Sequence, residues 1–176
     1  MATDHVVKSV LFVIAMESEA QPLLNRLELV PLENSIPHSP CKIFVGEHNG
    51  AKVSVVINGK CETYKVDNVG TTPAALSTFL AINQLKPDLV VNAGTAGGFK
   101  RKGASIGDSY ISTLIKNHDR RIPIPGFTEY GVGSYESLQV PQLVKVRLLA
   151  ERTLDQTTFR TLIYLYMYRR SALKLV

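Results

Sequence analysis

Residues 9–19 read SVLFVIAMESE, an apolar run of strand length that leads directly into two carboxylates. The first six residues, 9–14, have the apolar, β-rich composition of a strand covered on both faces. A helix is expected over about residues 17–27. Its first turn contains Glu17 and Glu19, where the helix dipole favours negative charge. The stretch predicts the first strand and helix of a layered α/β domain.

Further strands are predicted from apolar runs bounded by turn residues. Asn49-Gly50 lies between the apolar segments 41–47 and 52–57, and Asn-Gly in this position predicts a β-hairpin. Residues 88–92 (DLVVN) predict a second buried strand, which ends in a glycine-rich loop. Residues 107–114 are interpreted as a further strand.

Prolines help to locate the helices. Pro22 is expected in or near the first turn of the first helix, because a deeper proline would break it. A second helix is predicted with Thr72 as its N-cap and Pro73 at its first helical position, ending before Pro87. One mostly apolar stripe of this helix contains Leu76, Phe79, Leu80 and Asn83.

The order of these elements predicts a single α/β domain built in layers around a mixed sheet. A chain of 176 residues is long enough for one hydrophobic core and short for two. Residues 1–145 are expected to form this domain, and residues 146–176 to be a divergent tail. Within the tail, the apolar run 161–168 fits a strand, a buried helix segment or an unstructured stretch.

The net charge of +5 comes mostly from the tail. Between residues 146 and 176, six basic residues face two acidic ones, whereas basic and acidic residues nearly balance in the first 145. A nucleic-acid surface is therefore not expected on the main domain.

The sequence also has no apolar run long enough to span a bilayer, no secretory signal pattern and no metal-binding cysteine spacing. A cytoplasmic protein without a metal is expected.

Two segments suggest chemistry. The loop Gly94-Thr-Ala-Gly-Gly98 follows a predicted strand, and ligands of open α/β sheets bind beyond the carboxyl ends of strands. Glu17 and Glu19 follow another strand. Taken alone, a glycine-rich loop is more often a simple turn, and two such acids are more often solvated partners of the helix dipole. The segment 118–121 (HDRR) suggests an acid/base pair, but we prefer a surface charge cluster for Arg120 and Arg121.

Together, three stretches resemble the methylthioadenosine/S-adenosylhomocysteine nucleosidases of the purine nucleoside phosphorylase superfamily, most closely the plant type. They are FVIAMESEAQPLLNRL, LKPDLVVNAGTAGGFKRKGASIGD, and HDRRIPIPGF followed by YGVG. The resemblance covers about residues 9–133. It implies a three-layer nucleoside phosphorylase-like domain around a mixed central sheet, incomplete at the C-terminus. It also implies a homodimer that uses no cofactor.

The activity implied by this resemblance is hydrolysis of the N-glycosidic bond of 5′-methylthioadenosine to adenine and 5-methylthioribose, in methionine salvage. Glu19 would be the general base that activates water and stabilises the developing ribosyl cation. Substrate-binding residues implied in the same way are Thr95, Ala96 and Gly97 at the water and ribose face, Met16 and Ile57 as pocket walls, and Ile124. The last of these lies in the segment 122–125, which would cover the partner subunit's 5′-alkylthio group.

The acids of the first loop favour hydrolysis over phosphorolysis. A phosphorylase holds a phosphate dianion where a hydrolase holds water, and Glu17 and Glu19 would repel a dianion there.

The resemblance fades after about residue 134. Members of the family have a Met-Glu pair that grips the ribose and an Asp that protonates the purine. Neither motif is found here, and Glu151 and Asp155 are not assigned to these roles. Low turnover is therefore expected. The alternative is a non-catalytic protein on the same scaffold, such as an inactive dimer partner or a storage protein.

Overall fold

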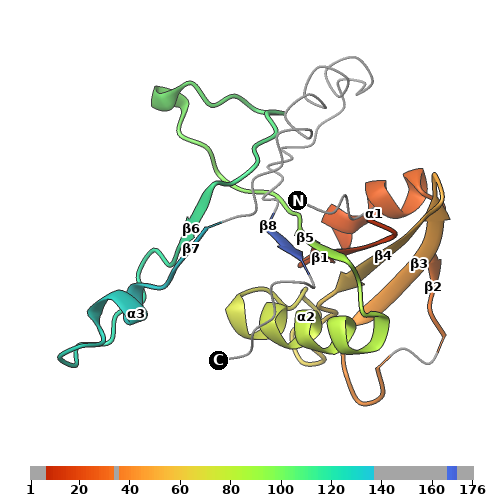
Figure 1. Cartoon of the computed structure of the whole chain (residues 1–176), viewed down its shortest axis with the longest axis horizontal. Coiled ribbons are helices and arrows are strands. Elements are labelled where there is room, and N and C mark those ends of the chain that lie inside the picture. Colours follow the sequence, from red (N-terminus) through yellow and green to blue (C-terminus); the bar gives the residue numbers. More distant parts are fainter. Residues whose placement is uncertain (1–6, 34–35, 137–165, 170–176) are drawn as a thin grey trace, which may run out of the picture.

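The computed structural model describes residues 7–33, 36–136 and 166–169. Strand β1 (Ser9–Ile14) lies inside a six-stranded sheet whose order is β2-β3-β4-β1-β5-β8. It pairs in parallel with β4 (Ala51–Ile57) on one side and β5 (Leu89–Asn92) on the other. The remaining pairs are antiparallel, so the predicted mixed sheet is confirmed (Figure 1).

The predicted hairpin is also confirmed. Strand β3 (Lys42–His48) pairs with β4, and β2 (Val30–Pro31) adds a short edge. Asn49 and Gly50 both have positive φ angles, +50° and +76°, as a two-residue turn of type I′ requires.

The strand at the opposite edge of the sheet, beside β5, comes from the tail. Residues Tyr166–Arg169 form β8, which pairs with β5 in antiparallel register. Of the three alternatives left open for the run 161–168, residues 166–168 adopt the strand. Residues 161–165 lie outside the described part.

Helices cover both faces of the sheet, as a three-layer domain requires. Helix α1 (Glu17–Arg26) buries Ala20 and Leu24 against Val55 and its neighbours on one face. Helix α2 (Thr71–Leu85) buries Ala81 against Leu11 and others on the opposite face. Alternate residues of β1 and β4 enter the two clusters, because successive side chains of a strand point to opposite faces.

Two details of the helices differ from the predictions. Pro22 lies in the second turn of α1 rather than the first. The helix tolerates it because Ser18 and Pro22 are exposed, so water can solvate the Ser18 carbonyl that loses its donor. Helix α2 begins at Thr71 with Gly70 as N-cap, which places Pro73 at the third position. The first N–H groups of a helix have no partner within the helix, so proline costs no hydrogen bond there.

The predicted strand over 107–114 is wrong. Only residues Leu114–Lys116 form a strand, β6, and it pairs with β7 (Ser134–Glu136) rather than with the main sheet. With α3 (Thr128–Val132), these strands form an arm that extends away from the main sheet (Figure 1). The residue pattern alone did not reveal that residues 107–113 pair with no strand of the described chain.

The apolar stripe expected on α2 faces the core only in part, since Leu80 alone of its apolar side chains packs against the core cluster. Ser77 and Ala81 are buried instead, whereas Leu76 and Phe79 are 50% and 67% exposed. The residue pattern predicted the helix but not which side of it faces the sheet, since small residues pack where the helix lies closest to the sheet.

We predict that Leu11→Ala lowers the free energy of unfolding by about 2–5 kcal/mol, because Leu11 is fully buried and its removal leaves a cavity. Urea denaturation followed by circular dichroism measures this. The matched control is Leu114→Ala in the arm, where the side chain is 47% exposed and the change should be small. Equal losses in the two variants would contradict the core assignment.

Candidate functional site

Glu19 is the third residue of α1, just beyond the carboxyl end of β1. Its Oε2 accepts a hydrogen bond of 3.2 Å from the backbone N–H of Met16, the N-cap residue. The backbone N–H of Glu19 in turn bonds the Met16 carbonyl at 3.2 Å. These reciprocal contacts hold the Glu19 side chain back toward the start of the helix.

The other carboxylate oxygen of Glu19 contacts the glycine-rich loop. The backbone N–H and the hydroxyl of Thr95 both donate to Oε1, at 2.8 and 2.7 Å. The two segments meet because β1 and β5 are parallel neighbours, so their carboxyl ends share one edge of the sheet. The predicted neighbourhood of Glu19 and Thr95 is thus found in the structure.

Gly94 lies directly beside this carboxylate. A Cβ atom at this position would lie 3.4 Å from Oε1 and 3.5 Å from Oε2 of Glu19. These are ordinary van der Waals distances, so the contact between Thr95 and Glu19 does not depend on a glycine here.

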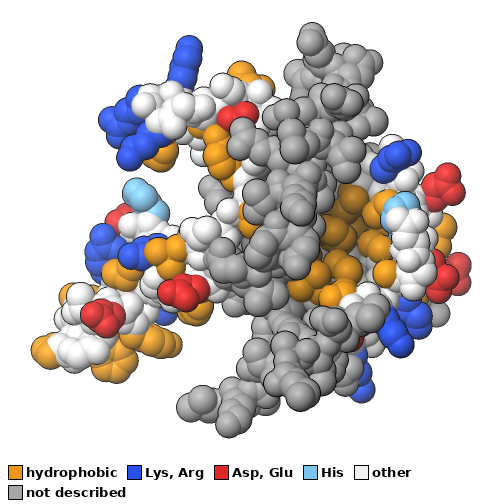
Figure 2. Space-filling view, turned by 45° about the horizontal axis from the view of Figure 1, so that its top comes forward, with side chains coloured by type: hydrophobic (Ala, Val, Ile, Leu, Met, Phe, Trp, Pro, Cys, Tyr) orange, Lys and Arg blue, Asp and Glu red, His pale blue; other side chains and the backbone are white. Residues whose placement is uncertain are grey.

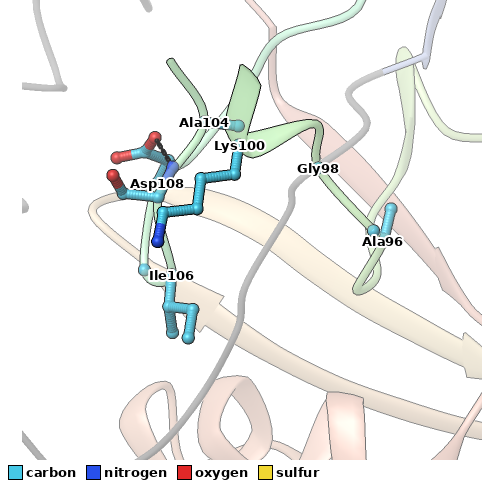
Figure 3. A pocket seen from close by; sticks show the side chains of 9 residues that line it. Ala96, Gly98, Lys100, Ala104, Ile106 and Asp108 are labelled. Carbon is cyan, nitrogen blue, oxygen red and sulfur yellow. Dashed lines mark hydrogen bonds between the residues drawn. The ribbon is translucent and has the colours of Figure 1, made fainter. Parts of the chain in front are cut away.

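A cavity of about 450 Å³ lies beside the same loop, on residues that follow Thr95. Ala96, Gly97 and Gly98 form one part of its lining, and Lys100, Ile106 and Asp108 are among the residues of the other part. Figure 3 shows Lys100 and Asp108 on one side of the cavity and Ala96 on the other. Glu19 is not among the lining residues, so this cavity adjoins the Glu19–Thr95 contact without containing it.

The other predicted site residues lie in three different settings. Met16 is half-buried and contacts Glu19 through its backbone. Ile57 is only 1% exposed and belongs to the core cluster beneath α1, so it is not open to a ligand in this structure. Ile124 is 55% exposed and lies on the arm. The structure therefore brings Met16 to Glu19 and leaves Ile57 and Ile124 apart from it.

Residues 118–121 lie on the same arm and are mostly exposed. The guanidinium of Arg120 lies 5.6 Å from the ring centroid of Tyr130, and Arg121 donates to the Arg120 carbonyl. This agrees with the surface cluster preferred for the two arginines. Figure 2 shows Lys and Arg side chains gathered on this side of the molecule and hydrophobic side chains near the end of the arm.

Glu17 is not a free negative charge. Its Oε1 lies 3.2 Å from the ammonium of Lys42, and its Oε2 lies 2.8 Å from that of Lys60. The hydrogen bonds to Lys60 and then to Lys42 lower the pKa of the Glu17 carboxyl below 4.5, and Glu17 raises the pKa of Lys60. The repulsion of a dianion expected at this loop therefore rests on Glu19, because two cations compensate the charge of Glu17.

Sequence reasoning missed the partners of this first turn. Lys42 and Lys60 come from β3 and from the segment after β4, and Asp67 accepts the backbone N–H of Glu17 at 3.3 Å. No local spacing relates these residues to Glu17. The only available signal was the parallel pairing of two predicted strands, which brings the chain after β4 to the end of β1.

Within the described residues, no group of three or more His, Cys, Asp or Glu side chains could hold a metal ion. None of the helices described is long and apolar enough to cross a membrane.

Comparison with known proteins places this geometry in a family. A model of the phosphorylase superfamily matches residues 9–162. The chain belongs to the phosphorylase superfamily. The match includes β1, the Glu19 turn, the glycine-rich loop and the arm, and it extends into the segment that we separated as a tail.

Within this superfamily the chain is similar to nucleosidases. It is 45% identical over 141 residues to the 5′-methylthioadenosine/S-adenosylhomocysteine nucleosidase of Arabidopsis thaliana, which covers 79% of this chain and 56% of the relative. It is 43% identical over 163 residues to the 5′-methylthioadenosine nucleosidase of the same plant, covering 86% and 60%. The chain thus spans little more than half the length of these relatives.

The fold agrees with a solved structure of this group. The apo form of Arabidopsis thaliana 5′-methylthioadenosine nucleosidase superposes with a TM-score of 0.76 at 44% identity, over 80% of this chain and 59% of that chain. The nucleoside phosphorylase-like fold predicted from the sequence is confirmed.

The ion pairs of Glu17 predict a pH-dependent contribution to stability. A carboxyl whose pKa is lowered by folding stabilises the native state above its unfolded pKa, and this contribution disappears as the pH falls through the folded value. We expect Glu17→Gln to lower the free energy of unfolding by about 0.2–1 kcal/mol at neutral pH, since the pairs are partly exposed. As the pH falls below the unfolded pKa and through the lower folded pKa, the wild type and the variant should converge.

Urea denaturation at a series of pH values measures this difference. The control is Glu47→Gln, which removes an exposed carboxylate from the far end of β3. A Glu17→Gln effect that stays constant down to strongly acidic pH would contradict the assigned ion pairs.

Proposed function

We propose that this chain carries the water-activating part of a 5′-methylthioadenosine nucleosidase. The reaction is hydrolysis of the N-glycosidic bond to adenine and 5-methylthioribose, by a cytoplasmic enzyme of methionine salvage. The observation that carries the proposal is the double contact of Thr95 with the Glu19 carboxylate at the shared edge of β1 and β5. The similarity to the two plant nucleosidases supports the choice of substrate.

The hydrogen bonds of Glu19 are compatible with a general base. An ionised carboxylate offers roughly four acceptor sites. The N–H of Met16 and the N–H and hydroxyl of Thr95 occupy three of them. About one site remains to accept a hydrogen bond from water, in a fixed direction set by the other three.

This arrangement gives each residue a role in hydrolysis. A water molecule bound to the remaining site loses a proton to Glu19 as its oxygen attacks C1′ of the ribose. The negative carboxylate also stabilises the positive charge that develops on the ribosyl ring. Thr95, Ala96 and Gly97 would line the ribose face, and Met16 would form a wall of the site. Ile57 is buried in the core beneath α1, so it would support this wall without touching the ligand.

Departure of adenine also requires a proton on the base, and we assign no residue of this chain to that step. General acid catalysis typically contributes on the order of 10²–10⁴-fold, so low turnover is expected from this chain. A non-catalytic role on the same scaffold is the alternative, and adenine release distinguishes the two.

We predict that the chain releases adenine from methylthioadenosine slowly and that Glu19→Gln lowers the rate by about 10²–10⁴-fold, because the amide cannot accept the proton of water. Adenine is measured by chromatography with protein in excess over substrate. Binding of methylthioadenosine, measured by calorimetry, should persist in the variant.

Glu47→Gln is the control and should leave the rate unchanged. Equal rates for the wild type and Glu19→Gln would show that Glu19 is not the base. Substrate binding without any adenine release from the wild type would favour the non-catalytic alternative.

The exposed face of α2 supports the homodimer that the resemblance implies. Leu76 and Phe79 are at least half exposed, and so are three apolar side chains of the preceding segment, Tyr64, Val66 and Val69. Exposed apolar surface is characteristic of interaction sites. We assign it to a second copy of the chain, with Ile124 of the arm reaching toward the partner's substrate.

We predict that Phe79→Glu converts the dimer to a monomer, because a charge would be buried in an apolar interface. Sedimentation velocity measures the molecular mass. The control is Val30→Glu on the edge strand β2, which replaces a side chain that is 59% exposed elsewhere and should leave the dimer intact. A monomeric wild type, or dimerisation unaffected by Phe79→Glu, would contradict this interface.

A further inference from the structure

The segment 58–69, between β4 and α2, is fixed at its base by buried polar contacts. Asn58 is 2% exposed and Ser77 of α2 is 1% exposed, and the Ser77 hydroxyl donates to the Asn58 amide oxygen at 2.6 Å. The Asn58 amide donates to the Asn68 carbonyl at 2.9 Å. Because both ends of the segment join the same buried network, its base cannot shift without leaving buried polar groups unpaired.

Gly59 fixes the same base from the other side. Its φ angle is +79°, and a Cβ atom there would lie 1.8 Å from the Pro40 carbonyl oxygen. The segment then folds back on itself, since Lys60 and Asp67 form an isolated antiparallel bridge. The side chains of these two residues are therefore presented from a rigid base.

Glu17 joins this segment to α1 and β3. Its carboxylate binds Lys60 of the segment and Lys42 of β3, and its backbone N–H donates to Asp67. The first residue of α1 is thus held at three points by chain that lies far away in the sequence.

These contacts bear directly on Glu19, which lies in the same helical turn. The Glu19 carboxylate reaches Thr95 only if the first turn of α1 keeps its orientation about the helix axis. The contacts between Met16 and Glu19 lie within this turn, so they do not fix its orientation relative to the sheet. The three contacts of Glu17 connect the first turn of α1 to β3 and to the segment 58–69. A displacement of about 1 Å in a catalytic group can cost on the order of 10²-fold in rate.

We propose that Glu17 is a positioning residue: by clamping the first turn of α1 to Lys42, Lys60 and Asp67, it holds the Glu19 carboxylate against Thr95. The effect of Glu17 on catalysis rests on the proposed function, whereas its effect on the position of Glu19 rests on the contacts themselves. Partly exposed ion pairs contribute little to global stability, so the main effect of the clamp is on position. The lowered pKa of Glu17 agrees with a carboxylate held between two cations.

The direct test is amide hydrogen exchange of the chain by NMR. The Thr95 N–H is bonded to Glu19, whereas the Ala93 N–H, two residues earlier in the same loop, is bonded to the Val13 carbonyl at 3.1 Å. Glu17→Gln should accelerate exchange at Thr95 by about tenfold or more and leave Ala93 unchanged, because only the first contact depends on Glu19. Glu62→Gln, an exposed acid of the same segment, is the matched control and should change neither.

A double-mutant cycle tests whether Lys60 acts through Glu17. Lys60→Gln should also accelerate exchange at Thr95, and the double variant should resemble Glu17→Gln, because Glu17→Gln already removes the ion pair with Lys60. In the adenine-release assay, Glu17→Gln should lower kcat more than it changes KM.

Unchanged exchange at Thr95 in Glu17→Gln would overturn the proposal, as would equal acceleration at Thr95 and Ala93, which indicates general loosening. Failure of the proposed function gives a different result. In that case Thr95 exchange still responds to Glu17→Gln, while adenine release is absent or insensitive to Glu19→Gln.

Discussion

The parallel pairing of β1 with both β4 and β5 is the constraint on which the site depends. It directs the chain after all three strands to one edge of the sheet. Glu19 follows β1, Lys60 and Asp67 follow β4, and Thr95 follows β5. Residues separated by up to 76 positions in the sequence therefore form hydrogen bonds within 3.3 Å. The apolar composition of β1 makes this possible, because it allows helices to cover both faces of the sheet.

The first turn of α1 contains two carboxylates with different surroundings. Glu17 is compensated by two lysines and bound at three points to β3 and to the segment 58–69. Glu19 is held by neutral donors and keeps acceptor capacity for water. Identical side chains two residues apart can thus serve different purposes, one in position and one in chemistry. The geometry of their partners, rather than their residue type, separates the two roles.

Local sequence signals predicted the elements whose formation depends on local physics. The apolar run of β1, the Asn49-Gly50 turn and the strand after Pro87 are confirmed, since composition and turn chemistry determine them. The resemblance supplied the pairing of Glu19 with the Thr95 loop. Features that depend on distant chain were missed: the orientation of α2, the irregular structure of residues 107–113, and the lysine partners of Glu17. Periodicity describes one segment at a time and contains no information about which neighbour it meets.

The contact between the Thr95 amide and the Glu19 carboxylate is the central claim, and NMR scalar coupling across that hydrogen bond tests it most directly. The account predicts a measurable coupling between the Thr95 amide nitrogen and the Glu19 carboxyl carbon, consistent with their 2.8 Å contact through Oε1. The coupling should vanish in Glu19→Ala while the β1–β5 couplings remain. A Thr95 amide coupled to another acceptor, or to none, in an otherwise folded chain would contradict the account.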